Sequence, residues 1–195
     1  MKKTILLIAM GLGFISTSLA QNIVTDSSLV QPDYTHKANI GSIFWIVRPL
    51  GNDGDLYETG IGGNFSFDYY INNRFHIGAE VGLISADYND PNGVKEHLNL
   101  VPVVLTAGVH TDLGNSIDLY GEIAGGKFNF ATTVKGEASK APGGISPRIG
   151  IAFNICNDKL FMDINTHYIY VFKEAINLDN YSSVGFGIGL LYTVF

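Results

Sequence analysis

Large apolar residues alternate with small or polar residues along much of this chain. In segment 61–71, Phe65 and Phe67 fall on one face of an extended strand, and Asn64 and Asp68 fall on the other. Successive side chains of a strand point to opposite faces, so an alternation of period two predicts a strand with one apolar face. The pattern therefore indicates strands rather than helices.

Eight segments of this kind can be counted, and each is long enough to cross a bilayer as a tilted strand of about 9–11 residues. They are 37–49, 58–71, 75–86, 98–111, 117–130, 144–156, 160–172 and 182–195. Short connections (72–74, 112–116, 157–159) alternate with long ones (50–57, 87–97, 131–143, 173–181). Outer-membrane barrels have this rhythm because their periplasmic turns are short and their extracellular loops are long.

The faces opposite the apolar rows are rich in glycine. A soluble sandwich or a lipocalin-like barrel would point its apolar face inward, and glycine has no clear use on a solvent-exposed face. Inside a narrow barrel, glycine leaves room for neighbouring side chains. The sequence therefore favours an all-β, eight-stranded antiparallel up-and-down transmembrane β-barrel. The opposed glycines are Gly62, Gly78, Gly82, Gly126, Gly150, Gly185, Gly187 and Gly189.

The apolar rows of such a barrel face lipid. We expect this of Phe65, Phe67, Tyr69, Phe186, Ile188, Leu190 and Tyr192. Aromatic girdles are expected at the two interfaces, from Trp45, Tyr168 and Tyr170 on the extracellular side and from Tyr69, Phe75 and Tyr192 on the periplasmic side. The last members of one apolar row are Tyr192 and Val194, and Phe195 falls on the opposite face. This predicts either a bulge near the end of the strand or a position at the rim for Phe195.

The N-terminal segment has the features of a secretory signal peptide. Lys2 and Lys3 precede an uncharged run, and Ser18-Leu19-Ala20 forms a small-residue cleavage site. We expect a signal peptide at 1–20, a periplasmic lead-in at 21–36 and the barrel domain at 37–195. Loss of the two lysines changes the formal net charge from −6 to −8, which does not suit a nucleic-acid partner. The single cysteine, Cys156, is interpreted as a small buried residue.

The signal peptide, the eight alternating strands and the terminal Phe195 together resemble the small outer-membrane barrels of the OmpA/OmpX type. The resemblance covers about residues 37–195 and is architectural. It implies the outer membrane of a Gram-negative bacterium, with membrane lipid and lipopolysaccharide as neighbours. It also implies that the barrel-assembly machinery reads the last strand, with Phe195 as the assembly signal.

Several polar residues fall on the predicted inward faces. These are Asp68, His76, Glu80, Asp118, Glu122, Arg148, Asp163 and His167. Buried charges must be paired or hydrated, so a structural network is expected, with Arg148 bridging Glu80 or Glu122. A gated path for protons or ions is the alternative. The predicted function is a structural or surface-interaction role with at most a narrow pore.

A lipid-modifying enzyme of the deacylase or acyltransferase type is the alternative function. Outer-membrane lipid A deacylases place a Ser two residues after a His, but Ile169 stands there after His167. Without that nucleophile the triad fails, so no catalytic residues are predicted. His97 is the one candidate in a loop. No cofactor and no metal site are expected, and loops 87–97 and 131–143 are the candidates for contact with an extracellular ligand.

Overall fold

Eight antiparallel strands form a closed barrel in a computed structural model of this chain. The structure describes residues 37–50, 58–89, 95–113, 116–132, 141–156, 159–172 and 181–194. The expected signal peptide at 1–20 and lead-in at 21–36 lie outside them. In the part of the chain that is described, no helix is long and apolar enough to cross a membrane.

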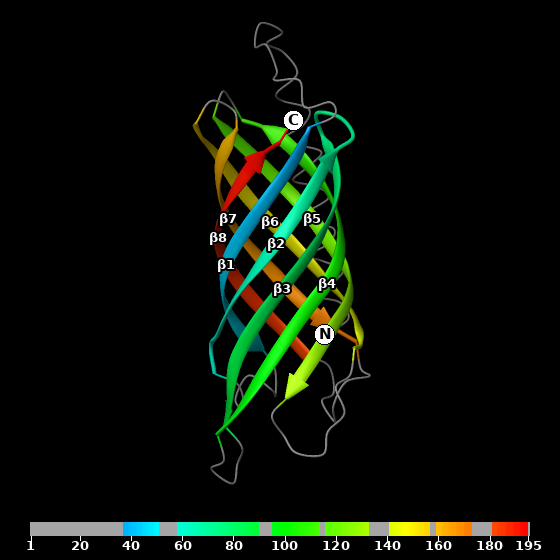
Figure 1. The fold of residues 1–195 in the computed structure, drawn as a ribbon, viewed down its shortest axis with the longest axis vertical. Helices are drawn as coiled ribbons and strands as arrows, with labels where there is room; N and C mark the ends of the chain where they lie inside the picture. The colour runs from blue at the N-terminus through cyan, green and yellow to red at the C-terminus, as the bar shows by residue number, and fades with distance from the viewer. Residues whose placement is uncertain are drawn as a thin grey trace, which may run out of the picture. The chain divides into compact units, whose positions relative to one another are not determined.

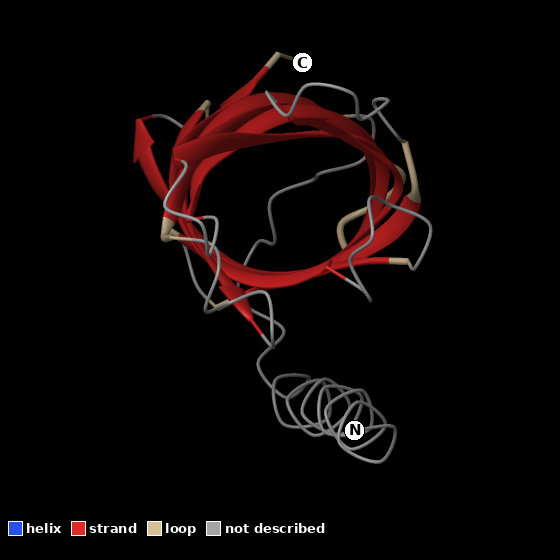
Figure 2. Ribbon diagram, turned by 90° about the horizontal axis from the view of Figure 1, so that it is seen from below, coloured by secondary structure: helices blue, strands red, loops and turns tan. Residues whose placement is uncertain are grey.

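Each strand pairs with the next in sequence, and β1 pairs with β8, so no sheet edge remains (Figures 1 and 2). The predicted all-β up-and-down barrel is confirmed. The strands are β1 (Ala38–Leu50), β2 (Gly60–Tyr70), β3 (Phe75–Asn89), β4 (Lys95–Asp112), β5 (Ile117–Thr132), β6 (Gly143–Cys156), β7 (Leu160–Val171) and β8 (Tyr181–Thr193).

The hairpin of β3 and β4 is longer than the sequence predicts. Asp87 pairs with His97 across it, so the expected loop 87–97 is wrong at both ends. The loop expected at 131–143 also loses its ends, because 131–132 belong to β5 and Gly143 belongs to β6. Beyond the lipid, both faces of a strand can be polar. The alternation then fades while backbone pairing continues.

The outer face of the barrel carries the apolar rows. Phe65 and Phe186 are 55% and 57% exposed, and Tyr69 is half-exposed. The structure places the other expected members of these rows outside as well, namely Phe67, Ile188, Leu190 and Tyr192. Val194 continues the row, and Phe195 lies outside the described residues. So much exposed apolar surface is unfavourable in water and is the requirement for contact with lipid.

Two expectations about single side chains are wrong. Trp45 is 3% exposed and lies inside the barrel, so it belongs to no aromatic girdle. It falls on the inward phase of β1, and Gly187 opposite it in β8 leaves the space that its ring occupies. Cys156 is exposed rather than buried, because β6 ends there at the short-turn end of the barrel.

The inside of the barrel has two halves of different character. Toward the long connections, apolar side chains pack against one another, and Phe128 and Phe130 are 1% and 0% exposed. Toward the short turns, the inward residues are mostly polar or charged. We call the first group the apolar plug; its members are Ile43, Trp45, Val47, Ile84, Leu98, Leu100, Val104, Ala124, Phe128, Phe130, Ile169, Val171 and Tyr181.

A lysine on the outer face tests the membrane position of the barrel. Ile188 lies near the middle of β8, whereas Val194 follows its end. We expect Ile188→Lys to lower the free energy of unfolding by about 2–4 kcal/mol, and Val194→Lys by about 0–1 kcal/mol, because the cost of a cation depends on its depth in the bilayer. Urea titrations in lipid vesicles measure both values. Equal losses of unfolding free energy in the two variants would contradict a membrane position in which Ile188 lies deeper in the bilayer than Val194.

Candidate functional site in the barrel lumen

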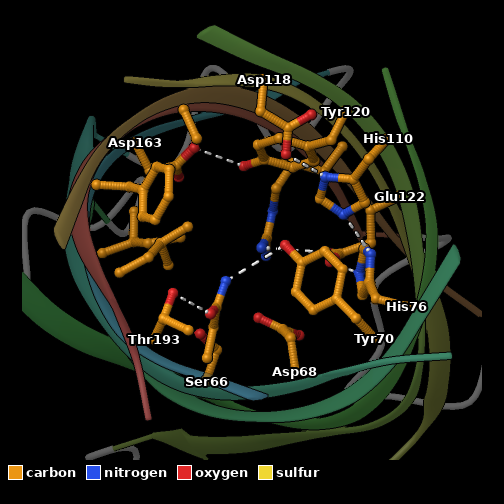
Figure 3. Close-up of a pocket in the computed structure, with 16 residues that line it drawn as sticks. Ser66, Asp68, Tyr70, His76, His110, Asp118, Tyr120, Glu122, Asp163 and Thr193 are labelled. Atoms are coloured by element: carbon orange, nitrogen blue, oxygen red, sulfur yellow. Dashed lines mark hydrogen bonds and ion pairs between the residues drawn. The ribbon is translucent and has the colours of Figure 1, made fainter. Parts of the chain in front are cut away.

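Ionisable side chains from six strands converge in the half of the lumen near the short turns. They surround a cavity of about 30 Å³, which is room for about one water molecule (Figure 3). The structure places the predicted inward residues Asp68, His76, Asp118, Glu122, Arg148 and Asp163 on its lining, and Glu80 binds Arg148 beside it. His110, which sequence reasoning missed, also lines it. Its position on the same phase as Thr106 and Gly108 in β4 is the signal that could have found it.

Arg148 is the cation of this site and is almost entirely buried. Its Nη1 and Nη2 donate to the two carboxylate oxygens of Glu80 over 2.6 and 2.8 Å. The same Nη1 lies 3.1 Å from Glu122 Oε1. On its other side, the guanidinium carbon stands 5.4 Å from the ring centroid of Trp45. A two-pronged Arg–carboxylate pair is the strongest geometry for a buried ion pair.

Two histidines join a second pair of acids into a chain, which we call the histidine relay. Asp118 Oδ2 lies 2.7 Å from His110 Nδ1, and His110 Nε2 lies 2.6 Å from His76 Nδ1. His76 Nε2 then lies 2.9 Å from Glu122 Oε2. The relay thus runs Asp118–His110–His76–Glu122 and ends on the carboxylate that faces Arg148.

The relay requires one proton more than two neutral imidazoles and two ionised carboxyl groups carry. Its three hydrogen bonds use all four ring nitrogens of His76 and His110, and each bond needs one proton. Two neutral imidazoles supply two N–H groups. The third proton therefore makes one ring an imidazolium or makes one end carboxyl neutral. This count holds whichever nitrogen carries each proton.

Two smaller groups of hydrogen bonds border the same cavity. The Tyr120 hydroxyl donates to Asp163 over 2.8 Å, and Asn165 donates to the other oxygen of Asp163. Near the rim, Thr193 donates to Asn39 over 2.9 Å. Asp68 has a weaker contact, because Thr106 Oγ1 stands 3.5 Å from its Oδ1.

Glycines across the strands make room for the largest of these groups. A Cβ at Gly108 would collide with the ring of His76, and one at Gly78 would collide with the Asp68 carboxylate. Gly150 does the same for Tyr120. The inward glycines thus act as sockets for side chains of neighbouring strands, as the glycine pattern of the sequence led us to expect.

His167 stands apart from this network. It lies next to Arg148 in the pairing of β6 with β7, and its ring meets Trp45 edge to face with centroids 4.5 Å apart. Neither of its ring nitrogens has a hydrogen-bond partner. At the opposite end of the barrel, His97 Nδ1 is 2.7 Å from Asp87 Oδ1, and both side chains are exposed.

Asp68, His76 and Glu122 are the residues of the described ranges that could hold a metal ion. One donor atom from each lies within 4.8 Å of the other two. Zinc accepts both imidazole nitrogen and carboxylate oxygen as ligands, so these three donor atoms suit it. The sequence predicted no metal site, because it did not show that strands β2, β3 and β5 bring these residues together.

No protein-family model and no curated protein sequence matches the chain. Among solved structures, Neisserial surface protein A is 13% identical, with a TM-score of 0.63 over 80% of this chain and 96% of that one. OprG from Pseudomonas aeruginosa is 13% identical, with a TM-score of 0.61 over 85% and 99%. Ail, the attachment invasion locus protein of Yersinia pestis, is 14% identical, with a TM-score of 0.55 over 82% and 99%.

These identities establish the fold alone. It is the fold of small outer-membrane barrels, as the resemblance to OmpA/OmpX-type proteins implied. The expected outer-membrane location agrees with the proteins that share this fold and with the apolar outer face of the barrel.

A double-mutant cycle measures the worth of the Arg148–Glu80 pair. We expect Arg148→Met and Glu80→Gln each to lower the free energy of unfolding by about 3–5 kcal/mol, because each leaves the other group buried without its partner. The double variant should lose clearly less free energy of unfolding than the sum of the losses in the two single variants. Urea unfolding in lipid vesicles gives all three values.

The exposed pair Asp87–His97 is the control, because a single contact of 2.7 Å joins its acid to its basic side chain and its environment is aqueous. Its coupling free energy should be about 0–1 kcal/mol. Additive costs for Arg148 and Glu80 would show that the pair contributes no coupling.

Proposed function

We propose that this protein is a structural outer-membrane barrel with a lumen closed to solutes, and that any surface role belongs to its extracellular end. The observation that carries the proposal is the filling of the lumen by the apolar plug and the Arg148 network in series. An eight-stranded barrel is just wide enough for side chains to fill its interior. A route for water or ions would have to displace both layers.

The apolar plug supports closure most directly. Phe130 meets Tyr181 edge to face with ring centroids 5.7 Å apart, which joins β5 to β8 across the lumen. These rings are among the least exposed side chains of the described barrel. An apolar constriction resists the passage of ions because water wets it poorly.

The extracellular end is the part most suited to contact with other molecules. The β3–β4 hairpin runs past the point where the apolar alternation stops, so it stands clear of the lipid. Among proteins of the same fold, one is named a surface protein and another an attachment invasion locus protein. This favours an extracellular partner, reached through the hairpin connection and the segment between β5 and β6.

The remaining partners follow from the membrane position. Membrane lipid and lipopolysaccharide would cover the apolar rows of the outer face. The barrel-assembly machinery would recognise the last strand and Phe195, a role that rests on the resemblance to OmpA/OmpX-type proteins.

The enzyme alternative has one observation in its favour, which is the exposed Asp87–His97 pair at the extracellular end. An acid that orients a histidine is two thirds of a hydrolytic triad. We expect Asp87→Asn and the unchanged protein to leave the acylation of lipopolysaccharide in outer-membrane vesicles identical, as seen by mass spectrometry. Acyl loss or transfer with the unchanged protein alone would favour the enzyme.

Conductance tests the closed lumen. We expect no steady current across planar bilayers that contain the purified barrel, and none for Arg148→Ala, because the apolar plug remains in place. A variant with Phe128→Ala, Phe130→Ala and Arg148→Ala together should conduct, since it opens both of the layers that close the lumen. A steady current through the unchanged protein, or through Arg148→Ala alone, would overturn the proposal.

A further inference from the structure

We propose that Asp68, His76 and Glu122 form a binding site for a divalent transition metal of the zinc class, reached from the periplasmic end of the barrel. The site lies outside the structural and surface roles proposed above. It rests on four observations: the donor set, the relay behind His76, the buried charge, and an unpartnered polar group on the cavity.

The donor atoms are close to a coordination geometry. One atom from each residue lies within 4.8 Å of the others, and His76 Nε2 is 2.9 Å from Glu122 Oε2. Ligands around a zinc ion at 2.0–2.2 Å lie roughly 3.3 Å apart. Small side-chain movements therefore suffice, and Asp68 can make them because its contact with Thr106 is long.

The histidine relay has the arrangement that holds a metal-bound imidazole. With a metal on His76 Nε2, His76 Nδ1–H donates to His110 Nε2 and His110 Nδ1–H donates to Asp118. Metal-binding histidines commonly donate their second N–H in this way to a carboxylate or another acceptor. Two neutral imidazoles then satisfy both bonds, and the third proton of the relay is no longer needed.

Binding therefore exchanges a cation for a proton. The bond from the metal to His76 Nε2 forms as the proton between His76 and Glu122 leaves to water. Glu122 Oε2 is then free to bind the metal, and its other oxygen keeps the ion pair with Arg148. The exchange involves no oxidation and needs no further reactant.

The buried charge favours a cation here. Five carboxyl groups surround the cavity or bind its lining, against the single guanidinium of Arg148; they are Asp68, Glu80, Asp118, Glu122 and Asp163. Charges out of water must be compensated. The third proton of the relay compensates part of this excess, and a divalent cation compensates more of it.

The cavity offers the space and a further ligand group. Ser66 is 2% exposed, its hydroxyl has no hydrogen-bond partner, and it lies on the cavity lining two residues from Asp68 (Figure 3). The cavity of about 30 Å³ can hold a water that completes the coordination. Near the rim, Asn39, Tyr70 and Thr193 are the groups that an entering ion would pass.

Zinc titration of the full barrel in lipid nanodiscs tests the site. Calorimetry should give one zinc ion per barrel, and experiments in buffers of different ionisation enthalpy should give release of about one proton. Asp68→Asn and His76→Phe should weaken zinc binding at least tenfold. Asp118→Asn, which leaves all three ligands in place, should weaken it by about 10–100-fold through the relay.

The exposed pair provides the control. Asp87→Asn with His97→Asn removes an acid and a histidine in similar contact at the other end of the barrel, and it should leave zinc binding unchanged. If His76→Phe does not fold, as judged by circular dichroism, Asp68→Asn decides alone because its carboxylate has the weakest contact. Absence of binding at 1 mM zinc, unchanged binding in Asp68→Asn, or loss of binding in the control would each overturn the proposal.

Discussion

The closure of β1 on β8 is the constraint on which the rest of this molecule depends. In a bilayer, no water is present to satisfy backbone N–H and C=O groups, so each strand must have a partner on both sides. Closure with eight strands then sets the width of the lumen. Because the outer face of the barrel contacts lipid, every charged side chain of the strands must lie near a strand end or in the lumen. The polar interior is thus a consequence of the membrane, and its crowding is a consequence of the strand number.

Crowding determines how the interior is divided. The apolar plug stabilises the half toward the long connections through packing, and Trp45 Nε1 is a buried polar atom there without a hydrogen-bond partner among the described residues. The other half has several acids and one guanidinium, so its stability depends on geometry: two prongs from Arg148 to Glu80, and a relay that satisfies four ring nitrogens with three protons. A buried network of this kind favours one arrangement of the strands over shifted registers, because a shift by one residue would turn its members outward.

The alternation of apolar and polar residues was enough to predict the barrel and the inward phase of most strands. It was not enough to predict which inward residues meet. Arg148 was expected to bridge Glu80 or Glu122 and contacts both. Its contact with Glu80 depends on how β3 and β6 are staggered across the lumen, which local sequence does not contain. Trp45 was misplaced because an aromatic near a strand end suits a girdle as well as a lumen. The strands of the β3–β4 hairpin were predicted too short. An alternation of period two marks only the part of a strand in contact with lipid, and backbone pairing continues beyond that part.

The glycine sockets have a consequence for how such an interior can change. Tyr120 fits because position 150 lacks a side chain, and His76 fits because position 108 lacks one. A larger residue at either glycine is tolerated only if its partner across the strands becomes smaller in the same lineage. The width of the lumen is therefore kept by compensating substitutions at pairs of positions rather than at single positions. Substitution histories of related chains should record exchanges of bulk between adjacent strands, with the summed volume at each level nearly constant.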